Sequence, residues 1–141
     1  MSSDFIYEVK NHVAYMTINR PEKRNALSAE VVQAFLEYMD KAEADKDVRA
    51  ICITGAGEKA FCAGAELGAS AGAVGEERLK SIRDYAELLK KMSQTGKPIL
   101  ARVAGHCMAG GLGLMLSCDI VIAKSGVMFG APEINVGLWP M

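Results

Sequence analysis

The segment ILARVAGHCMAGGLGLMLSCDIVIA, residues 99–123, joins two β-prone runs through a glycine-rich turn and an apolar helix. The runs are Ile99–Val103 and Ile120–Ala123, and the helix is predicted over residues 112–117. A strand, a helix and a second strand in this order are typical of an α/β protein. The segment therefore predicts the α/β class.

The region around this segment, residues 104–141, has few charged side chains. Its only Asp, Glu, Lys or Arg residues are Asp119, Lys124 and Glu133, so we expect the region to form core. Asp119 precedes a predicted strand and is expected to bond to nearby backbone. Residues 137–141 are apolar, whereas chain ends normally lie in water. We therefore expect the chain to end inside a larger fold or against another subunit.

The first 54 residues contain no glycine and follow the same α/β pattern. Residues 5–9 and Val13–Ile18 are predicted strands around a short turn, and residues 49–54 form a further buried strand. Ser28 is a good N-cap for a helix between them. The apolar face of this helix carries Val31, Val32, Phe35, Met39 and Ala42.

All 14 glycines lie between Gly55 and Gly137. In residues 55–75 the apolar residues show no convincing helical or strand period, and an amphipathic helix then begins at Glu76. The apolar side of that helix carries Leu79, Ile82, Ala86, Leu89 and Met92. We expect its charged side to be exposed to solvent.

The composition excludes several classes of protein. The 16 basic and 17 acidic residues give a net charge of −1, which leaves no basic surface for nucleic acid or an anionic membrane. No apolar run reaches the roughly 18 residues that span a bilayer, and residues 1–5 do not begin a signal peptide. The four cysteines lack metal-ligand spacing, so we expect no metal site and reduced thiols in a cytoplasmic protein.

Two glycine-rich loops carry the chemical interpretation. They are Phe61-Cys62-Ala63-Gly64-Ala65-Glu66-Leu67, and Ala109-Gly110-Gly111 at the start of a predicted helix. Small residues let backbone N–H groups approach a ligand, and a helix N-terminus has N–H groups without partners. Facing each other, such loops could form an oxyanion hole, in which one donor contributes about 3–4 kcal/mol of transition-state stabilisation. The spacing also permits a purely structural interpretation, in which the glycines only allow tight helix–strand packing.

Glu133 is a second candidate, because its sequence neighbours are apolar. Burial would disfavour the charged carboxylate and suit this group to proton transfer, whereas an exposed loop glutamate is the alternative. His106, beside the second glycine loop, is expected to be structural. Cys62 and Cys107 have no obvious activating base and are expected to be packing residues.

Residues 55–60, Gly-Ala-Gly-Glu-Lys-Ala, fit the G-x-G-x-x-A pattern of dinucleotide-binding proteins. That pattern requires a helix after the glycines and an acidic residue at the end of a second strand. Here the chain continues into the first glycine loop, and the next acidic pair, Glu76-Glu77, begins a helix. We therefore do not expect nucleotide binding.

Six blocks of sequence together resemble the enoyl-CoA hydratase/isomerase (crotonase) family, in the family's order and at its spacing. The match runs from Val13 to the end of the chain. The blocks are TINRP (17–21) through NALS (25–28), AFCAGAEL (60–67), KPI (97–99), GHCMAGGLG (105–113), SCDI (117–120) and FGAPEINVG (129–137).

The resemblance implies a spiral of ββα units with flanking helices, of which residues 1–141 would be the N-terminal part. It implies an acyl-CoA thioester substrate, with no cofactor apart from the coenzyme A of that substrate. The thioester oxygen would be held by the backbone N–H groups of Ala65 and Gly110, and Glu133 would be the acid/base. Family members assemble as trimers or dimers of trimers, so a homo-oligomer is also implied. The coenzyme A moiety would lie along Arg24, Ala26, Leu27, Ala63, Ala65 and Leu67, with Arg24 a candidate for a phosphate.

Two departures from the family pattern bear on the reaction. Family hydratases add water with two glutamates, and this chain has Gly113 in place of the first and Glu133 as the second. A single acid/base suits double-bond isomerisation, and thioester hydrolysis or decarboxylation through the same enolate are further options. Family members are also nearly twice as long, so we expect the C-terminal helical region to be missing and the isolated monomer to be unstable. An acyl-CoA binding or scaffold protein is the alternative to an enzyme.

Overall fold

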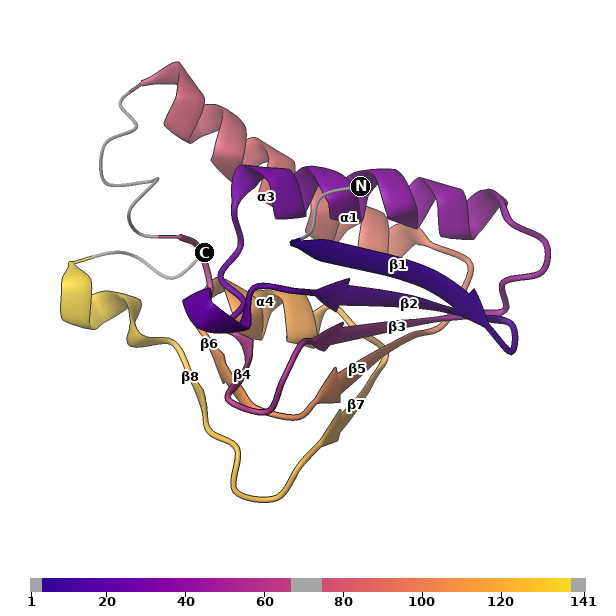
Figure 1. Ribbon diagram of the computed structural model, residues 1–141. Coiled ribbons are helices and arrows are strands. Elements are labelled where there is room, and N and C mark those ends of the chain that lie inside the picture. The colour runs from indigo at the N-terminus through magenta and orange to yellow at the C-terminus, as the bar shows by residue number, and fades with distance from the viewer. Residues whose placement is uncertain (1–3, 67–74, 138–141) are drawn as a thin grey trace.

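The computed structural model describes residues 4–66 and 75–137 of the 141-residue chain. Within these residues the chain forms a five-stranded sheet and a three-stranded sheet, with helices packed against them (Figure 1). The elements in chain order are β1 (Phe5–Lys10), β2 (Val13–Ile18), η1 (Pro21–Lys23), α1 (Ala29–Ala44), β3 (Ala50–Gly55), β4 (Ala60–Cys62), α3 (Glu76–Gln94), β5 (Ile99–Val103), β6 (His106–Met108), α4 (Gly110–Leu116), β7 (Ile120–Ala123), β8 (Phe129–Gly130) and η2 (Pro132–Val136).

The N-terminal third folds as local signals predict. β1 and β2 pair antiparallel, and the turn residues Asn11 and His12 adopt positive φ angles of 51° and 65°. Two left-handed residues are a common connection in a two-residue hairpin. The Ser28 hydroxyl accepts a hydrogen bond from the Val31 N–H and caps α1, whose five predicted apolar residues are all buried. The predicted hairpin and helix are both confirmed.

The rest of the chain repeats one pattern, in which a strand of the large sheet is followed by a short strand of the small sheet and then by a helix. The repeats are β3–β4–α3, β5–β6–α4 and β7–β8–η2. The large sheet has the order β1-β2-β3-β5-β7, and its strands are parallel from β2 onward. The small sheet is parallel throughout, in the order β4-β6-β8. Each repeat therefore adds one strand to both sheets, which confirms the predicted spiral of ββα units.

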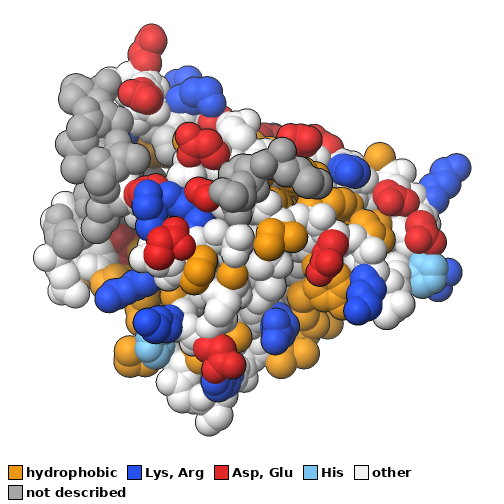
Figure 2. Space-filling model, viewed as in Figure 1, with side chains coloured by type: hydrophobic (Ala, Val, Ile, Leu, Met, Phe, Trp, Pro, Cys, Tyr) orange, Lys and Arg blue, Asp and Glu red, His pale blue; other side chains and the backbone are white. Residues whose placement is uncertain are grey.

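The expectation that residues 104–141 form core is wrong for much of their described part. Cys107, Leu114 and Met115 are buried, but every residue of β7 is exposed, with Ile120 at 52% and Ile122 at 60%. β7 is the last strand of the large sheet, and no described element covers it. Figure 2 shows hydrophobic side chains at the surface on this side of the sheet. Apolar composition alone cannot tell a core strand from an edge strand that lacks a partner.

The apolar face predicted for α3 is only partly correct. Met92 is buried as expected, but Leu79 is 51% exposed and Ala86 is exposed, while Leu88 is fully buried. The reason is visible in Figure 1, where the N-terminal turns of α3 extend beyond the rest of the fold and only its C-terminal part lies against α1. Among the described helices, none has the length and apolar character needed to cross a bilayer.

Candidate active site

The small sheet brings the two glycine-rich loops together. β4 and β6 are parallel neighbours, with Cys62 paired to Cys107, so the loops that follow them leave the sheet side by side. Gly64 has a φ of +91°, and a Cβ on it would lie 2.7 Å from the Ala109 Cβ and 2.9 Å from the Gly110 nitrogen. Only glycine fits this approach. The glycines therefore permit tight packing, as the structural interpretation requires, and the same packing brings the loops into contact.

The backbone of the first loop directs the Ala65 N–H toward the second. Ala65 forms an isolated parallel bridge with Leu27, in which the Leu27 N–H donates to the Gly64 carbonyl at 2.8 Å and the Glu66 N–H donates to the Leu27 carbonyl at 3.1 Å. Successive residues of an extended chain alternate in direction, so the Ala65 N–H points away from Leu27. Its nitrogen is 3.8 Å from where a Cβ on Gly110 would lie.

The amides of Ala65 and Gly110 have no backbone acceptor among the described residues. Gly110 is the first residue of α4, and the preceding Ala109 has a positive φ of 53° that turns the chain into the helix. The first N–H groups of a helix have no partner within the helix. Two adjacent, unpaired N–H groups from different loops are the arrangement that a thioester oxygen would require.

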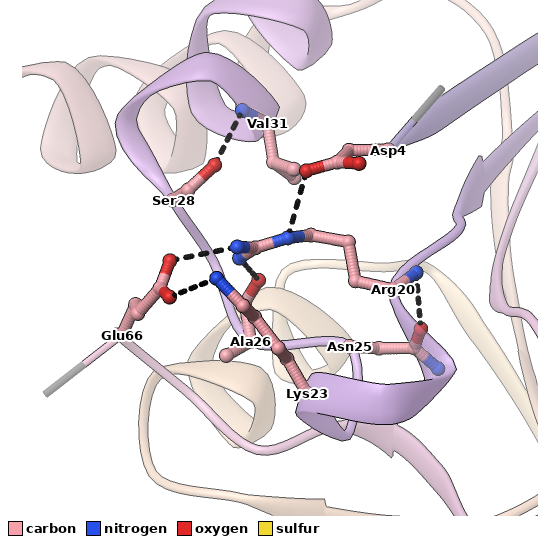
Figure 3. A network of polar contacts seen from close by, with 8 residues as sticks. All are labelled: Asp4, Arg20, Lys23, Asn25, Ala26, Ser28, Val31 and Glu66. Carbon is pink, nitrogen blue, oxygen red and sulfur yellow. Dashed lines mark hydrogen bonds and ion pairs between the residues drawn. The ribbon is translucent and has the colours of Figure 1, made fainter. Parts of the chain in front are cut away.

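A buried arginine holds the first loop in place (Figure 3). Arg20 is 4% exposed and reaches three partners, which are the Asp4 carboxylate at 2.9 Å, the Ala26 carbonyl at 2.8 Å and the Glu66 carboxylate at 2.8 Å. Lys23 donates to the other Glu66 oxygen at 2.7 Å. These hydrogen bonds from Lys23 and Arg20 hold the pKa of Glu66 below its ordinary value. The network ties the residue next to Ala65 to the N-terminal part of the chain.

Sequence analysis did not assign a role to Arg20 or Glu66. Their signal was that each is the only charged residue in its stretch, Arg20 in TINRP and Glu66 in AFCAGAEL. Asn25 supports the same loop, because its Oδ1 accepts from the Arg20 N–H at 2.9 Å and its Nδ2 donates to the Ala60 carbonyl at 2.7 Å.

The second loop is held by a tyrosine that sequence analysis also missed. The Tyr85 hydroxyl on α3 donates a hydrogen bond to the Gly110 carbonyl. A Cβ on Gly113 would lie 2.7 Å from that hydroxyl oxygen. Burial is the main reason that the pKa of Tyr85 is raised above its ordinary value, and the nearby Glu133 carboxylate adds to the shift. The hydroxyl is therefore a neutral group at physiological pH.

Glu133 lies in η2, the helical turn that closes the third repeat. Its side chain is half-buried, and its Oε2 is buried without a hydrogen-bond partner in the described part of the chain. A carboxylate oxygen in that state is costly unless it meets a donor, so it suits a group that exchanges a proton with a ligand.

Residues 24–27, which are expected along coenzyme A, lie beside the first loop. The Arg24 carbonyl accepts from the Ala63 N–H at 3.1 Å, and Leu27 pairs with Ala65, so residues 24–27 and 63–65 are adjacent. Ala26 and Leu27 are buried, Ala63 is half-buried and Arg24 is exposed in a left-handed conformation. Leu67 lies outside the described residues.

The weaker candidates have structural roles. Burial raises the pKa of the Cys62 and Cys107 thiols to about 12, which makes them inert packing groups. The His106 ring accepts a hydrogen bond from the Met128 N–H, and the Asp119 carboxylate accepts one from the Ile99 N–H. Within the described residues, no cluster of His, Cys, Asp and Glu could hold a metal ion.

Two surface features lie apart from these loops. Residues 55–60 lead into β4 and not into a helix, which confirms that they lack the context of a dinucleotide-binding site. A hollow of about 600 Å³ lies at the carboxyl ends of β2, β3 and β5, and none of the predicted site residues lines it.

Two sheets wound from successive ββα repeats define the crotonase fold. The structure superposes on an enoyl-CoA hydratase from Bacillus anthracis with a TM-score of 0.92 at 28% identity, covering 97% of this chain and 54% of that one. It superposes on an enoyl-CoA hydratase/isomerase from Xanthobacter autotrophicus Py2 with a TM-score of 0.90 at 36% identity, covering 97% and 52%.

The sequence comparison leads to the same family. The chain is similar to the (E)-benzylidenesuccinyl-CoA hydratase of Thauera aromatica, with 39% identity over 92% of this chain and 50% of that protein. It is 35% identical to the short-chain-enoyl-CoA hydratase of Clostridium acetobutylicum over 98% of this chain and 53% of that protein. The enoyl-CoA hydratase/isomerase family model matches residues 8–141. The chain belongs to this family and spans about half the length of the curated relatives it matches.

Proposed function

We propose that this chain processes acyl-CoA thioesters by stabilising a thioester enolate between the N–H groups of Ala65 and Gly110. The observation that carries the proposal is the convergence of two loops whose N–H groups lie close together without backbone acceptors in the described chain. Coenzyme A would lie along residues 24–27 and Ala63. Because it belongs to the substrate, no separate cofactor is needed.

Proton transfer in this proposal belongs to Glu133. In an isomerisation, its carboxylate would remove the proton from the carbon next to the thioester of a 3-enoyl-CoA and return it two carbons further on. The double bond moves into conjugation with the carbonyl, and no co-reactant is consumed. The partly buried carboxylate with an unpaired oxygen supports this role.

Replacing Glu133 with Gln tests the assignment. The variant keeps the size of the side chain and removes its basic oxygen, so turnover should fall at least a hundredfold, which is typical for loss of a general base. Acyl-CoA affinity, measured by calorimetry, should stay within about twofold of the unmodified protein. Activity that survives the substitution would contradict the role of Glu133.

A binding or scaffold protein is the second candidate, and Gly113 favours it. The position where the resemblance expects the first hydratase glutamate has no side chain, and the Tyr85 hydroxyl occupies the adjacent space. Absorbance assays with crotonyl-CoA and with a 3-enoyl-CoA distinguish the two candidates. Hydration consumes the conjugated enoyl thioester and isomerisation creates it, whereas a binding protein leaves the absorbance of both substrates unchanged.

The proposal also includes assembly of several copies, and the family resemblance implies a trimer. It further includes a cytoplasmic location. The exposed apolar residues of β7, together with Phe129 and Ile134, support association with further polypeptide. Sedimentation of the protein as a monomer that melts cooperatively would contradict this part.

A further inference from the structure

We propose that Tyr85 is a positioning residue for the Gly110 amide, and that Gly113 is required because it leaves room for the Tyr85 hydroxyl. The inference rests on the proposed function, because it assigns a role to Gly110 as a donor to the thioester oxygen. Tyr85 acts on that donor from α3 and lies 25 residues before Gly110 in the chain.

The hydroxyl is held at the first turn of α4. It donates to the Gly110 carbonyl. Gly110 and Gly111 have no side chains that could restrict the backbone here, so a fixed partner for the Gly110 carbonyl limits how this residue can rotate.

Gly113 is explained by the same hydroxyl. A Cβ at this position would lie 2.7 Å from the Tyr85 oxygen and 3.8 Å from its Cζ, so only the hydroxyl excludes it. The φ of Gly113 is not positive, so the backbone does not require glycine. Glycine within a helix costs about 1 kcal/mol relative to alanine. This residue therefore lowers helix stability and admits the tyrosine.

The pairing gives a reason for the missing glutamate. A side chain at position 113 and a hydroxyl from Tyr85 exclude each other, since they would occupy the same space. In this chain the neutral Tyr85 hydroxyl occupies the space and orients the Gly110 N–H donor. The pKa of Tyr85 is raised, so its hydroxyl keeps its proton and continues to donate across the physiological pH range.

The test compares Tyr85→Phe, Gly113→Ala and the double variant in the full-length protein. Tyr15→Phe is the matched control, because Tyr15 lies on β2 and its hydroxyl has no hydrogen-bond partner among the described residues. The probe is 4-(dimethylamino)cinnamoyl-CoA, whose absorption moves to longer wavelength when its thioester carbonyl is polarised. Binding of coenzyme A alone is measured in parallel.

Tyr85→Phe should reduce the wavelength shift and weaken binding of the probe about three- to tenfold, as expected for one hydrogen bond. Coenzyme A alone should bind within about twofold of the unmodified protein, because it does not use the Gly110 donor. Gly113→Ala should have the same effect as Tyr85→Phe, since it displaces the hydroxyl. The double variant should be no worse than either single one, and Tyr15→Phe should change nothing.

Three results would overturn the inference in different ways. A full wavelength shift in folded Tyr85→Phe would remove the role of Tyr85 and leave the proposed function intact. If Gly113→Ala weakened probe binding equally in the unmodified protein and in Tyr85→Phe, Gly113 would not act through the Tyr85 hydroxyl. An unmodified protein that produces no shift would refute the proposed oxyanion hole, and the inference with it. The double variant also guards against misfolding, because Phe at position 85 removes the hydroxyl that a Cβ at position 113 would meet and leaves only an ordinary contact with the ring.

Discussion

The two loops that present Ala65 and Gly110 are held by different chemistry. The first is held by charge, through the buried Arg20 and the Glu66 that it shares with Lys23. The second is held by an uncharged hydroxyl, which Tyr85 donates to the Gly110 carbonyl. Both arrangements fix a backbone segment that lacks large side chains. They differ in how they respond to mutation, pH and salt, and that difference makes the two anchors separable by experiment.

The largest effect is expected from Arg20→Met. The substitution keeps most of the buried volume but removes the ion pair of Arg20 with Asp4 and one of the two cationic partners of Glu66, which should lower the free energy of unfolding by about 3–5 kcal/mol. Urea denaturation measures the change. Lys23→Met is the control, since Lys23 is 52% exposed and should lose no more than about 1 kcal/mol. Equal losses would show that burial of the arginine is unimportant.

Alkaline pH should act on the second anchor. The pKa of Tyr85 is raised by burial, so above about pH 10 the unfolded chain releases a proton that the folded chain retains. The folded state then binds more protons, and stability falls as pH rises, by up to about 1.4 kcal/mol per pH unit. Denaturation between pH 9 and 11 should show a shallower decline of stability in Tyr85→Phe than in the unmodified protein. Identical slopes in both would mean that Tyr85 ionises freely.

Acid should act on the first anchor alone. The pKa of Glu66 is lowered by Lys23 and Arg20, so below its ordinary pKa the unfolded chain takes up a proton before the folded chain does. The stabilisation is present above that ordinary pKa and is lost as pH falls through the lowered one. The stability difference between the unmodified protein and Glu66→Gln should therefore shrink below about pH 4.5. The difference for Tyr85→Phe should stay constant over the same range, and a parallel decline would contradict the comparison.

Salt should produce the smallest effect. About 0.5 M NaCl shortens the screening length to about 4 Å, which weakens the half-exposed Lys23–Glu66 pair. The destabilisation caused by Glu66→Gln should decrease by less than about 1 kcal/mol, and that caused by Tyr85→Phe should not change. Thermal melts at two salt concentrations measure both. A salt dependence of the Tyr85→Phe difference would show that charge also acts at the second anchor.

The fold was predictable wherever a signal was local. Ser28 and the five apolar residues of α1 identify that helix, because capping and a helical period involve residues within a few positions of one another. The exposure of Ile120 and Ile122 was not predictable in the same way. Whether an apolar strand is buried depends on which element lies beside it, and β7 is at the edge of the sheet.

The sequence by itself determined the family, the two small-residue loops and Glu133, because these are properties of residue type and spacing. Only the tertiary structure showed that Arg20 holds Glu66 and that Tyr85 occupies the space above Gly113. The partners in these contacts are 46 and 28 residues apart, and no local pattern links them. They meet because successive ββα repeats place β4 beside β6 and bring Tyr85 of α3 to the start of α4, so the contacts depend on strand order and on where the helices lie.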